Sequence, residues 1–225
     1  MTLSFRVLGG DERIELADFR GVVAGYTGRD ASAVQHHIDE LAAIGVAPPP
    51  EVPMFYSVEA ASVNSDPEYR DSANLTSGEI EPVYIRHRGT YYLGVGSDHT
   101  DRDLERIDIG SSKRACPKPV GAEVVRIGSV AELAALDLDG SLARCTVDGR
   151  LYQEGGLGGL RTAADVIGRL LERFELVEDD DFVCLGGTLP LLDGAFAAGE
   201  YWHIEIELPD GSRLAHDYRM KGHTA

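Results

Sequence analysis

The chain has 225 residues, 43% of them hydrophobic, which is enough for one globular domain with a sizeable core. Its 38 acidic and 21 basic residues give a formal net charge of −17, which argues against nucleic acid or an anionic membrane surface as a partner. Three scattered cysteines, no secretory pattern at the N-terminus and no long apolar run predict a cytoplasmic protein without disulfides or membrane spans.

The first predicted element is a helix between Ser32 and Gly45. Ser32 and Gln35 have the spacing of a capping box, and Gly45 stands where a C-terminal cap is expected. Apolar residues between them recur at helical spacing: Val34, Ile38, Leu41 and Ala42. The proline-rich stretch 46–53 then predicts a rigid, extended connector.

Two hairpins are predicted further along the chain. Residues 81–92 fit a hairpin that turns at His87-Arg88-Gly89, and residues 201–219 fit one that turns at Pro209-Asp210-Gly211. In the second hairpin, apolar residues alternate with polar ones and predict one buried face: Trp202, Ile204, Ile206 and Leu208.

Capping patterns predict two more helices, at residues 129–136 and 162–174. Strands outnumber helices, so the expected fold class is α+β or mainly β. We expect a single domain, with residues 1–50 as an N-terminal segment and residues 51–225 as the main body.

An acidic pair opens the first hairpin, in Gly78-Glu79-Ile80-Glu81. Residues i and i+2 of a strand share one face, roughly 7 Å apart. Two carboxylates about 4 Å apart repel by about 4 kcal/mol at an effective dielectric constant of about 20, and a cation between them reverses the sign. Glu-x-Glu alone is more often a solvated strand face, as we expect for Glu205-Ile206-Glu207.

The segment 93–103 ends a strand in a turn of small residues that contains Asp98. It resembles the Gly-Tyr-Thr-x-x-Asn-Asp-x-Ser-x-Arg-Asp segment of the fumarylacetoacetate-hydrolase superfamily, with Arg102-Asp103 at the Arg-Asp position. The resemblance implies that Glu79, Glu81 and Asp98 bind Mg²⁺ or Mn²⁺.

Further segments resemble the same superfamily in order along nearly the whole chain, closest to its DUF2848 branch. Residues 111–117 resemble its Ser-Lys segment, which implies that Lys113 faces the active site. The hairpin that ends at Gln153 and the turn around Gly187 and Thr188 resemble substrate-binding segments, whose backbone amide and Thr hydroxyl bind the substrate carboxylate. The resemblance implies a mixed β-sandwich roll with a few short helices and an N-terminal lid helix.

The predicted lid follows Gly28-Arg29-Asp30, where some members have Gly-Arg-Asn and then a His-x-x-Glu pair. Here that pair is His37 and Glu40, and the resemblance implies that it activates water while Arg29 binds substrate. The alternative is a surface His and Glu on an amphipathic helix. Glu105 stands where the superfamily often has a substrate-positioning Gln, and its charge would disfavour a second substrate carboxylate or need Lys113 as a partner.

These features together predict a metal-dependent hydrolase that acts on a small oxo-acid, a 1,3-dicarbonyl or a related enol or amide. A decarboxylase, hydratase or isomerase on the same fold is the first alternative, and a non-catalytic metal- or metabolite-binding protein is the second. We expect a small-molecule substrate and a homodimer, as is usual in the superfamily.

Overall fold

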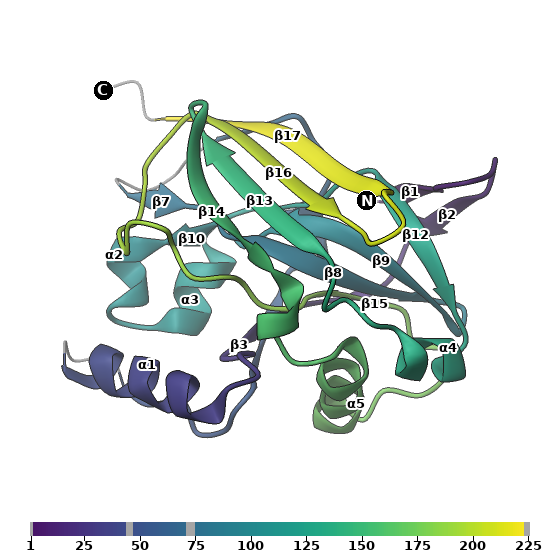
Figure 1. The fold of residues 1–225 in the computed structure, drawn as a ribbon, viewed down its shortest axis with the longest axis horizontal. Coiled ribbons are helices and arrows are strands. Elements are labelled where there is room, and N and C mark those ends of the chain that lie inside the picture. The colour runs from purple at the N-terminus through teal and green to yellow at the C-terminus, as the bar shows by residue number, and fades with distance from the viewer. Residues whose placement is uncertain (1, 44–46, 71–74, 223–225) are drawn as a thin grey trace.

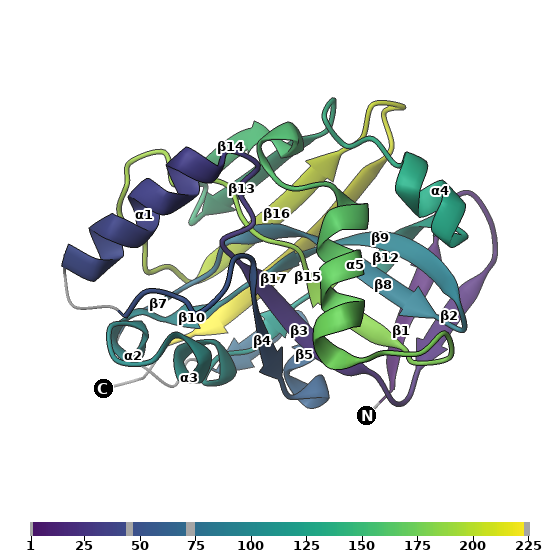
Figure 2. The same cartoon turned by 90° about the horizontal axis from the view of Figure 1, so that it is seen from below.

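The computed structural model describes residues 2–43, 47–70 and 75–222, except for four side chains of the first helix: His37, Glu40, Leu41 and Ala43. Within these residues, strands predominate over a few short helices, which confirms the predicted fold class. A five-stranded sheet packs across a curved eight-stranded one, and the longer helices lie along one side of the pair (Figures 1 and 2). None of the described helices is long and apolar enough to cross a membrane.

The larger sheet has the strand order β2-β1-β12-β9-β8-β15-β3-β4. Its strands are β1 (Leu3–Val7), β2 (Arg13–Leu16), β3 (Arg20–Gly25), β4 (Met54–Val58), β8 (Ile80–His87), β9 (Thr90–Ser97), β12 (Glu123–Gly128) and β15 (Phe182–Leu185). Because β1, β2 and β3 are all members, the N-terminal segment contributes to the body of the domain as well as to the predicted lid.

The smaller sheet has the order β14-β13-β16-β17-β6, and two short strand pairs, β10-β7 and β11-β5, connect the layers. These strands are β5 (Val63–Asn64), β6 (Glu68–Arg70), β7 (Thr76–Ser77), β10 (Thr100–Asp101), β11 (Lys118–Pro119), β13 (Leu142–Val147), β14 (Arg150–Gly156), β16 (Tyr201–Glu207) and β17 (Arg213–Lys221). Both predicted hairpins, β8–β9 and β16–β17, are confirmed.

The α-helices are α1 (Ala31–Ala43), α2 (Arg102–Glu105), α3 (Ile109–Arg114), α4 (Val130–Ala135) and α5 (Ala163–Phe174), and two 3₁₀ turns cover Ala60–Ser62 and Leu157–Gly159. The predicted caps of α4 and α5 are confirmed: Ser129 and Glu132 form a capping box, and Thr162 accepts from the N–H of Asp165.

The predicted cap of α1 is wrong by two residues. Asp30 Oδ1 accepts from the backbone N–H groups of Ser32 and Ala33, at 2.8 and 3.3 Å, so Asp30 is the N-cap. A carboxylate caps a helix as well as a hydroxyl does, and here it comes first along the chain. Gln35 instead donates to Asp39 on the next turn. The predicted C-terminal cap, Gly45, lies outside the described residues.

Strand β8 is buried on both faces, which fixes the frame of the candidate site. Ile80 and Tyr84 belong to the core between the two sheets and helices α4 and α5. Val83 and Ile85 point the other way, into a second core inside the curl of the larger sheet. Since close-packed interiors leave little freedom, groups at the end of β8 are held in defined positions.

Candidate metal and substrate site

The open end of the β8–β9 hairpin brings together the three carboxylates predicted to bind metal. Glu79 precedes β8, Glu81 lies within it, and Asp98 follows β9; the backbone N–H of Asp98 donates to Glu79 O at 2.9 Å. Glu81 and Asp98 are 2% and 0% exposed, and the Glu79 side chain is 15% exposed. Asp98 and Glu79 both act electrostatically on Glu81, so the three form one acidic cluster.

Two lysines neutralise Asp98. Its Oδ2 forms an ion pair with Lys113 Nζ, and Lys118 Nζ lies 3.4 Å from its Oδ1, which accepts no hydrogen bond. Lys118 is wholly buried and donates to the carbonyl oxygens of His99 and Lys113, both at 2.5 Å, and of Cys116 at 3.1 Å. Burial alone would raise the pKa of Asp98, but the two lysines lower it to about 2. Asp98 is therefore ionised at neutral pH.

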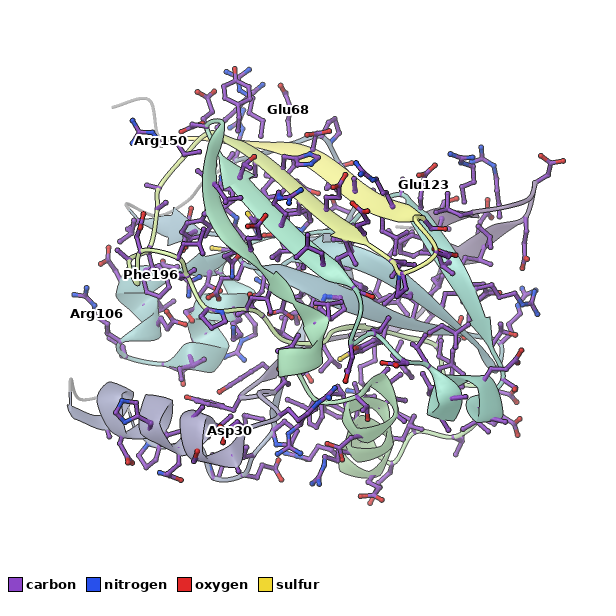
Figure 3. The ribbon with its side chains drawn as sticks, in the orientation of Figure 1. Asp30, Glu68, Arg106, Glu123, Arg150 and Phe196 are labelled. Carbon is purple, nitrogen blue, oxygen red and sulfur yellow. The ribbon has the colours of Figure 1, made fainter. Side chains whose placement is uncertain are left out.

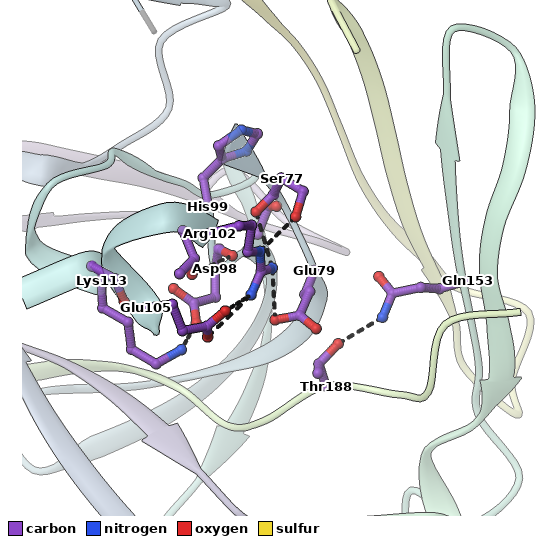
Figure 4. Close-up of polar contacts among 12 residues, drawn as sticks. Ser77, Glu79, Asp98, His99, Arg102, Glu105, Lys113, Gln153 and Thr188 are labelled. Atoms are coloured by element: carbon purple, nitrogen blue, oxygen red, sulfur yellow. Dashed lines mark hydrogen bonds and ion pairs between the residues drawn. The ribbon is translucent and has the colours of Figure 1, made fainter. Parts of the chain in front are cut away.

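Arg102, for which the sequence indicated no specific role, forms ion pairs with both Glu79 and Glu105. Its Nη2 lies 3.1 Å from Glu79, and its Nη1 donates to both carboxylate oxygens of Glu105, at 3.0 and 3.2 Å (Figure 4). Nε donates to Ser77 Oγ at 2.6 Å. The guanidinium carbon lies 3.9 Å from the ring centroid of Phe196, which flanks α2 in Figure 3. This buried guanidinium therefore holds Glu79 and Glu105 in fixed places.

Glu81 is held by the turn that was predicted to bind substrate. Its Oε2 accepts from the backbone N–H of Gly187 at 2.7 Å. Burial, and then Asp98, raise the pKa of Glu81 well above its usual range. Gly187 has φ +104°, and a Cβ there would lie 1.6 Å from Thr27 Oγ1. Only glycine fits this approach, which keeps the Gly187 N–H pointed at Glu81.

Hydrogen bonds of Gln153 and Thr188 connect β14, β8 and the turn that contains Gly187. Gln153 is fully buried; its Oε1 accepts from Ile80 N at 2.9 Å, and its Nε2 donates to Thr188 Oγ1 at 2.8 Å and Leu189 O at 2.7 Å. Thr188 donates in turn to Ile80 O at 2.9 Å. Both side chains are thus engaged with the protein in this conformation, and they position the turn next to Glu81.

Two tyrosines that the sequence gave no reason to single out lie beside Lys113. Lys113 Nζ is 5.8 Å from the ring centroid of Tyr56 on β4. Tyr26, directly after β3, has φ +57°, an uncommon conformation for a bulky residue. Lys113 and Glu105 both act electrostatically on Tyr26 and on Tyr56. No sequence pattern identifies such residues, because their position depends on how β3, β4, α2 and α3 meet.

Arg29, the substrate-binding residue predicted next to the lid, is not brought to the acidic cluster. Arg29 forms a two-pronged ion pair with Asp139, at 2.6 and 2.9 Å, and its Nε donates to Leu160 O at 3.0 Å. These contacts hold Arg29 against the loop between α4 and β13 and the segment before α5. His37 and Glu40 belong to α1, but their side chains lie outside the described residues. Their predicted role in activating water stays a prediction.

The acidic cluster fits a hard divalent cation in its chemistry. Carboxylate oxygens are the ligands that Mg²⁺ and Mn²⁺ prefer, and the buried Asp98 Oδ1 is an acceptor without a hydrogen bond. As the side chains stand, no three acidic, His or Cys residues in the described part of the chain are placed to hold one ion. Lys113 forms an ion pair with Asp98, and Arg102 forms one with Glu79, so a cation would have to displace these basic groups from the two carboxylates.

Comparison with known proteins places the chain in a family. Residues 24–218 match the DUF2848 family, which is described as a family of unknown function. None of the curated proteins matches the chain significantly.

Solved structures share the fold at low sequence identity. A fumarylpyruvate hydrolase from Pseudomonas aeruginosa, in complex with Mn²⁺ and pyruvate, matches with a TM-score of 0.66, 18% identity and coverage of 98% of this chain and 97% of that one. A 5-carboxymethyl-2-hydroxymuconate delta-isomerase from Mycobacterium smegmatis has a TM-score of 0.56, 17% identity and coverage of 91% and 80%. A 2-hydroxyhepta-2,4-diene-1,7-dioate isomerase from Mycobacterium marinum has a TM-score of 0.55, 14% identity and coverage of 92% and 75%. The chain therefore belongs to the DUF2848 family, and it has the fumarylacetoacetate-hydrolase fold that the sequence resemblance predicted.

Proposed function

We propose that this protein is a divalent-metal-dependent hydrolase of a small oxo-acid, a 1,3-dicarbonyl acid or a related enol or amide. Glu79, Glu81 and Asp98 would bind the Mg²⁺ or Mn²⁺. The observation that supports this most directly is the meeting of three carboxylates at the end of one rigid hairpin beside Lys113. One of their oxygens, Asp98 Oδ1, accepts no hydrogen bond and faces Lys118 at 3.4 Å. The P. aeruginosa hydrolase with Mn²⁺ and pyruvate lends support, because a 2-oxo acid is bound there on the same fold.

The chain's own groups would bind and orient the substrate. The bound cation would supply Lewis-acid polarisation of a substrate oxygen. Lys113, which is 7% exposed, would counter negative charge on the substrate once released from Asp98. The Gly187 N–H and the Thr188 hydroxyl would bind the substrate carboxylate after giving up their present acceptors, while Gln153 keeps their turn in place.

The lid would complete the site. His37 and Glu40, one turn apart on α1, would activate the attacking water, since a carboxylate beside an imidazole orients it as a general base. Arg29 would reach the substrate only by leaving Asp139, so closure of the α1 segment would cost that exposed ion pair. An exposed pair contributes about 0–1 kcal/mol, which substrate contacts can readily offset.

The test compares two Glu→Gln variants from the two Glu-x-Glu strands. Glu81→Gln should lower Mg²⁺- or Mn²⁺-dependent cleavage of acylpyruvates by about 100-fold or more, and should weaken metal binding measured by calorimetry. Glu205→Gln removes the same charge from β16, where Glu205 forms an ion pair with Arg213 at 3.6 Å, and should retain both properties. Equal activity of the two variants would contradict the proposed metal site.

Isomerisation is the second candidate, because two of the similar structures are isomerases. Product analysis by NMR separates the reactions: hydrolysis yields two smaller acids, decarboxylation releases CO₂, hydration adds water, and isomerisation leaves the mass unchanged. His37→Gln should abolish hydrolysis but spare isomerisation or decarboxylation. A non-catalytic protein would bind the cation and turn over none of these substrates.

A further inference from the structure

The charges around the candidate site nearly cancel. Four carboxylates and three cations take part: Glu79, Glu81, Asp98 and Glu105, with Arg102, Lys113 and Lys118. With all seven groups ionised, their formal sum is 3 − 4 = −1. One divalent cation, which would favour the ionised form of Glu81, would change the sum to +1. Arg102, Lys113 and Lys118 are at most 7% exposed, so water screens this sum poorly. One negative charge on the substrate would balance the site, and a second would leave an uncompensated charge in a buried place.

Tyr26 and Tyr56, which lie beside Lys113, form a neutral, aromatic surface that we call the wall of the site. A Cβ at Gly25 or Gly110 would come within 3.2 and 3.5 Å of the Tyr56 ring, so this ring is packed between the backbones of β3 and α3. Tyr26 is half-buried in its left-handed conformation and leads into Thr27, which contacts the Gly187 turn. Burial raises the pKa of both phenols, so at neutral pH they remain uncharged.

Among the described residues, the cations near this wall have acidic partners or point away from it. Lys113 pairs with Asp98, and Arg102 holds Glu105 with two hydrogen bonds. Arg114, on α3, faces Asp108 at 3.8 Å. Arg106, next to α2, is exposed and points outward in Figure 3. On the proposed function, Lys113 is engaged by the first substrate carboxylate. The other charged residue that acts on both tyrosines is Glu105, so a second carboxylate at this wall would meet a negative neighbour.

We infer that the substrate is a monoanion: a 2-oxo or 1,3-dicarbonyl acid with a single carboxylate and an uncharged acyl end that packs against Tyr26 and Tyr56. Glu105 selects against substrates with a second carboxylate at that end. This inference rests on the proposed function, because the charge of the bound cation enters the sum.

A turnover assay tests the selection. Wild-type protein and Glu105→Gln are compared, with Mg²⁺ present, on two acylpyruvates of equal length that end in a methyl group or in a carboxylate. The wild type should have a kcat/KM about tenfold or more higher for the methyl-ended substrate, and Glu105→Gln should reduce this ratio about tenfold because the formal sum rises to +2. Glu154→Gln, from an exposed pair with Arg144 on the other sheet, should keep the wild-type ratio.

A binding assay separates this inference from the proposed reaction. The probes are 2-oxopentanoate and 2-oxoglutarate, which have the same chain length and differ in the distal group, titrated by calorimetry with Mg²⁺. The wild type should bind 2-oxopentanoate about tenfold more tightly than 2-oxoglutarate, and Glu105→Gln should reduce this difference in affinity. If this preference holds but no acylpyruvate is cleaved, the hydrolase proposal fails and the inference stands. Three results would overturn the inference. The protein could cleave or bind the carboxylate-ended ligand better than the methyl-ended one, or bind neither probe. Glu105→Gln could also leave the ratio between the two ligands unchanged.

Discussion

Replacement of Lys118 by methionine should destabilise the protein more than any other loss of a single lysine charge. Lys118 is 0% exposed, and its ammonium group donates to three backbone carbonyls while it lies 3.4 Å from Asp98. Methionine has a similar length and volume, so Lys118→Met removes the charge and the donors without opening a large cavity.

The expected loss follows from these contacts. Removing one partner of a buried ion pair costs about 3–5 kcal/mol, because the other charge stays buried. Asp98 keeps Lys113, which reduces the cost, but three carbonyls lose a donor at about 1 kcal/mol or more each. We expect the free energy of unfolding to fall by about 4 kcal/mol. At roughly 2–4 °C per kcal/mol for a domain of this size, Tm should fall by about 10 °C.

Urea unfolding at pH 7 without divalent cations, followed by circular dichroism, measures this change. Lys221→Met is the matched control: Lys221 is about half exposed and pairs with Glu68 on the surface, so its loss should cost less than about 0.5 kcal/mol. The free energy of unfolding of Lys118→Met could instead lie within about 1 kcal/mol of the wild-type value. Lys118 would then not be the buried charge and donor described above, and the charge sum of the site would be wrong as well.

Two further predictions concern backbone packing and pH. Gly187→Ala should cost about 3 kcal/mol in urea unfolding, because its Cβ would overlap Thr27 at positive φ, whereas Gly168→Ala in α5, where nothing lies within 4 Å, should be neutral or stabilising. Burial lowers the pKa of His216 below its usual 6.5, against the opposing hydrogen bond with Asp66. The unfolded chain therefore binds the proton more readily, stability falls as the pH drops below 6.5, and His216→Gln should flatten that part of the stability curve; an unchanged slope would refute this.

Helices and hairpins could be predicted from the sequence where the residues that form the cap or the turn lie within a few positions of one another. The β8–β9 hairpin needs two residues with positive φ, and Arg88 and Gly89 adopt 49° and 74°. Helix α5 begins where Thr162 can accept from a backbone N–H three residues later. The start of α1 was missed because two residues could cap it and the spacing alone favours Ser32, whereas the chain geometry uses Asp30.

Contacts between distant segments could not be predicted in this way. Lys118 stands between two prolines, a pattern typical of an exposed loop, but β11 packs against β5 and β9 and Lys118 is fully buried. Gln153 reaches Ile80, 73 residues away, and Arg29 reaches Asp139 across 110 residues. The resemblance of ordered motifs singled out the three carboxylates and Lys113, which the structure brings together, but not Lys118 or the two tyrosines beside Lys113.

The pairing of each acid with its own protein donor bears on how the proposed site would work. In metal sites whose acidic ligands have no basic partner in the protein, folding is commonly coupled to metal binding, because the uncompensated like charges destabilise the empty site. Here Asp98 has Lys113 and Lys118, Glu79 has Arg102, and Glu81 has a backbone N–H. The domain can therefore fold without the ion, and the ion would compete with these donors. On this proposal, the ammonium of Lys113, once displaced from Asp98, becomes available to the substrate, so metal binding and substrate binding would favour one another.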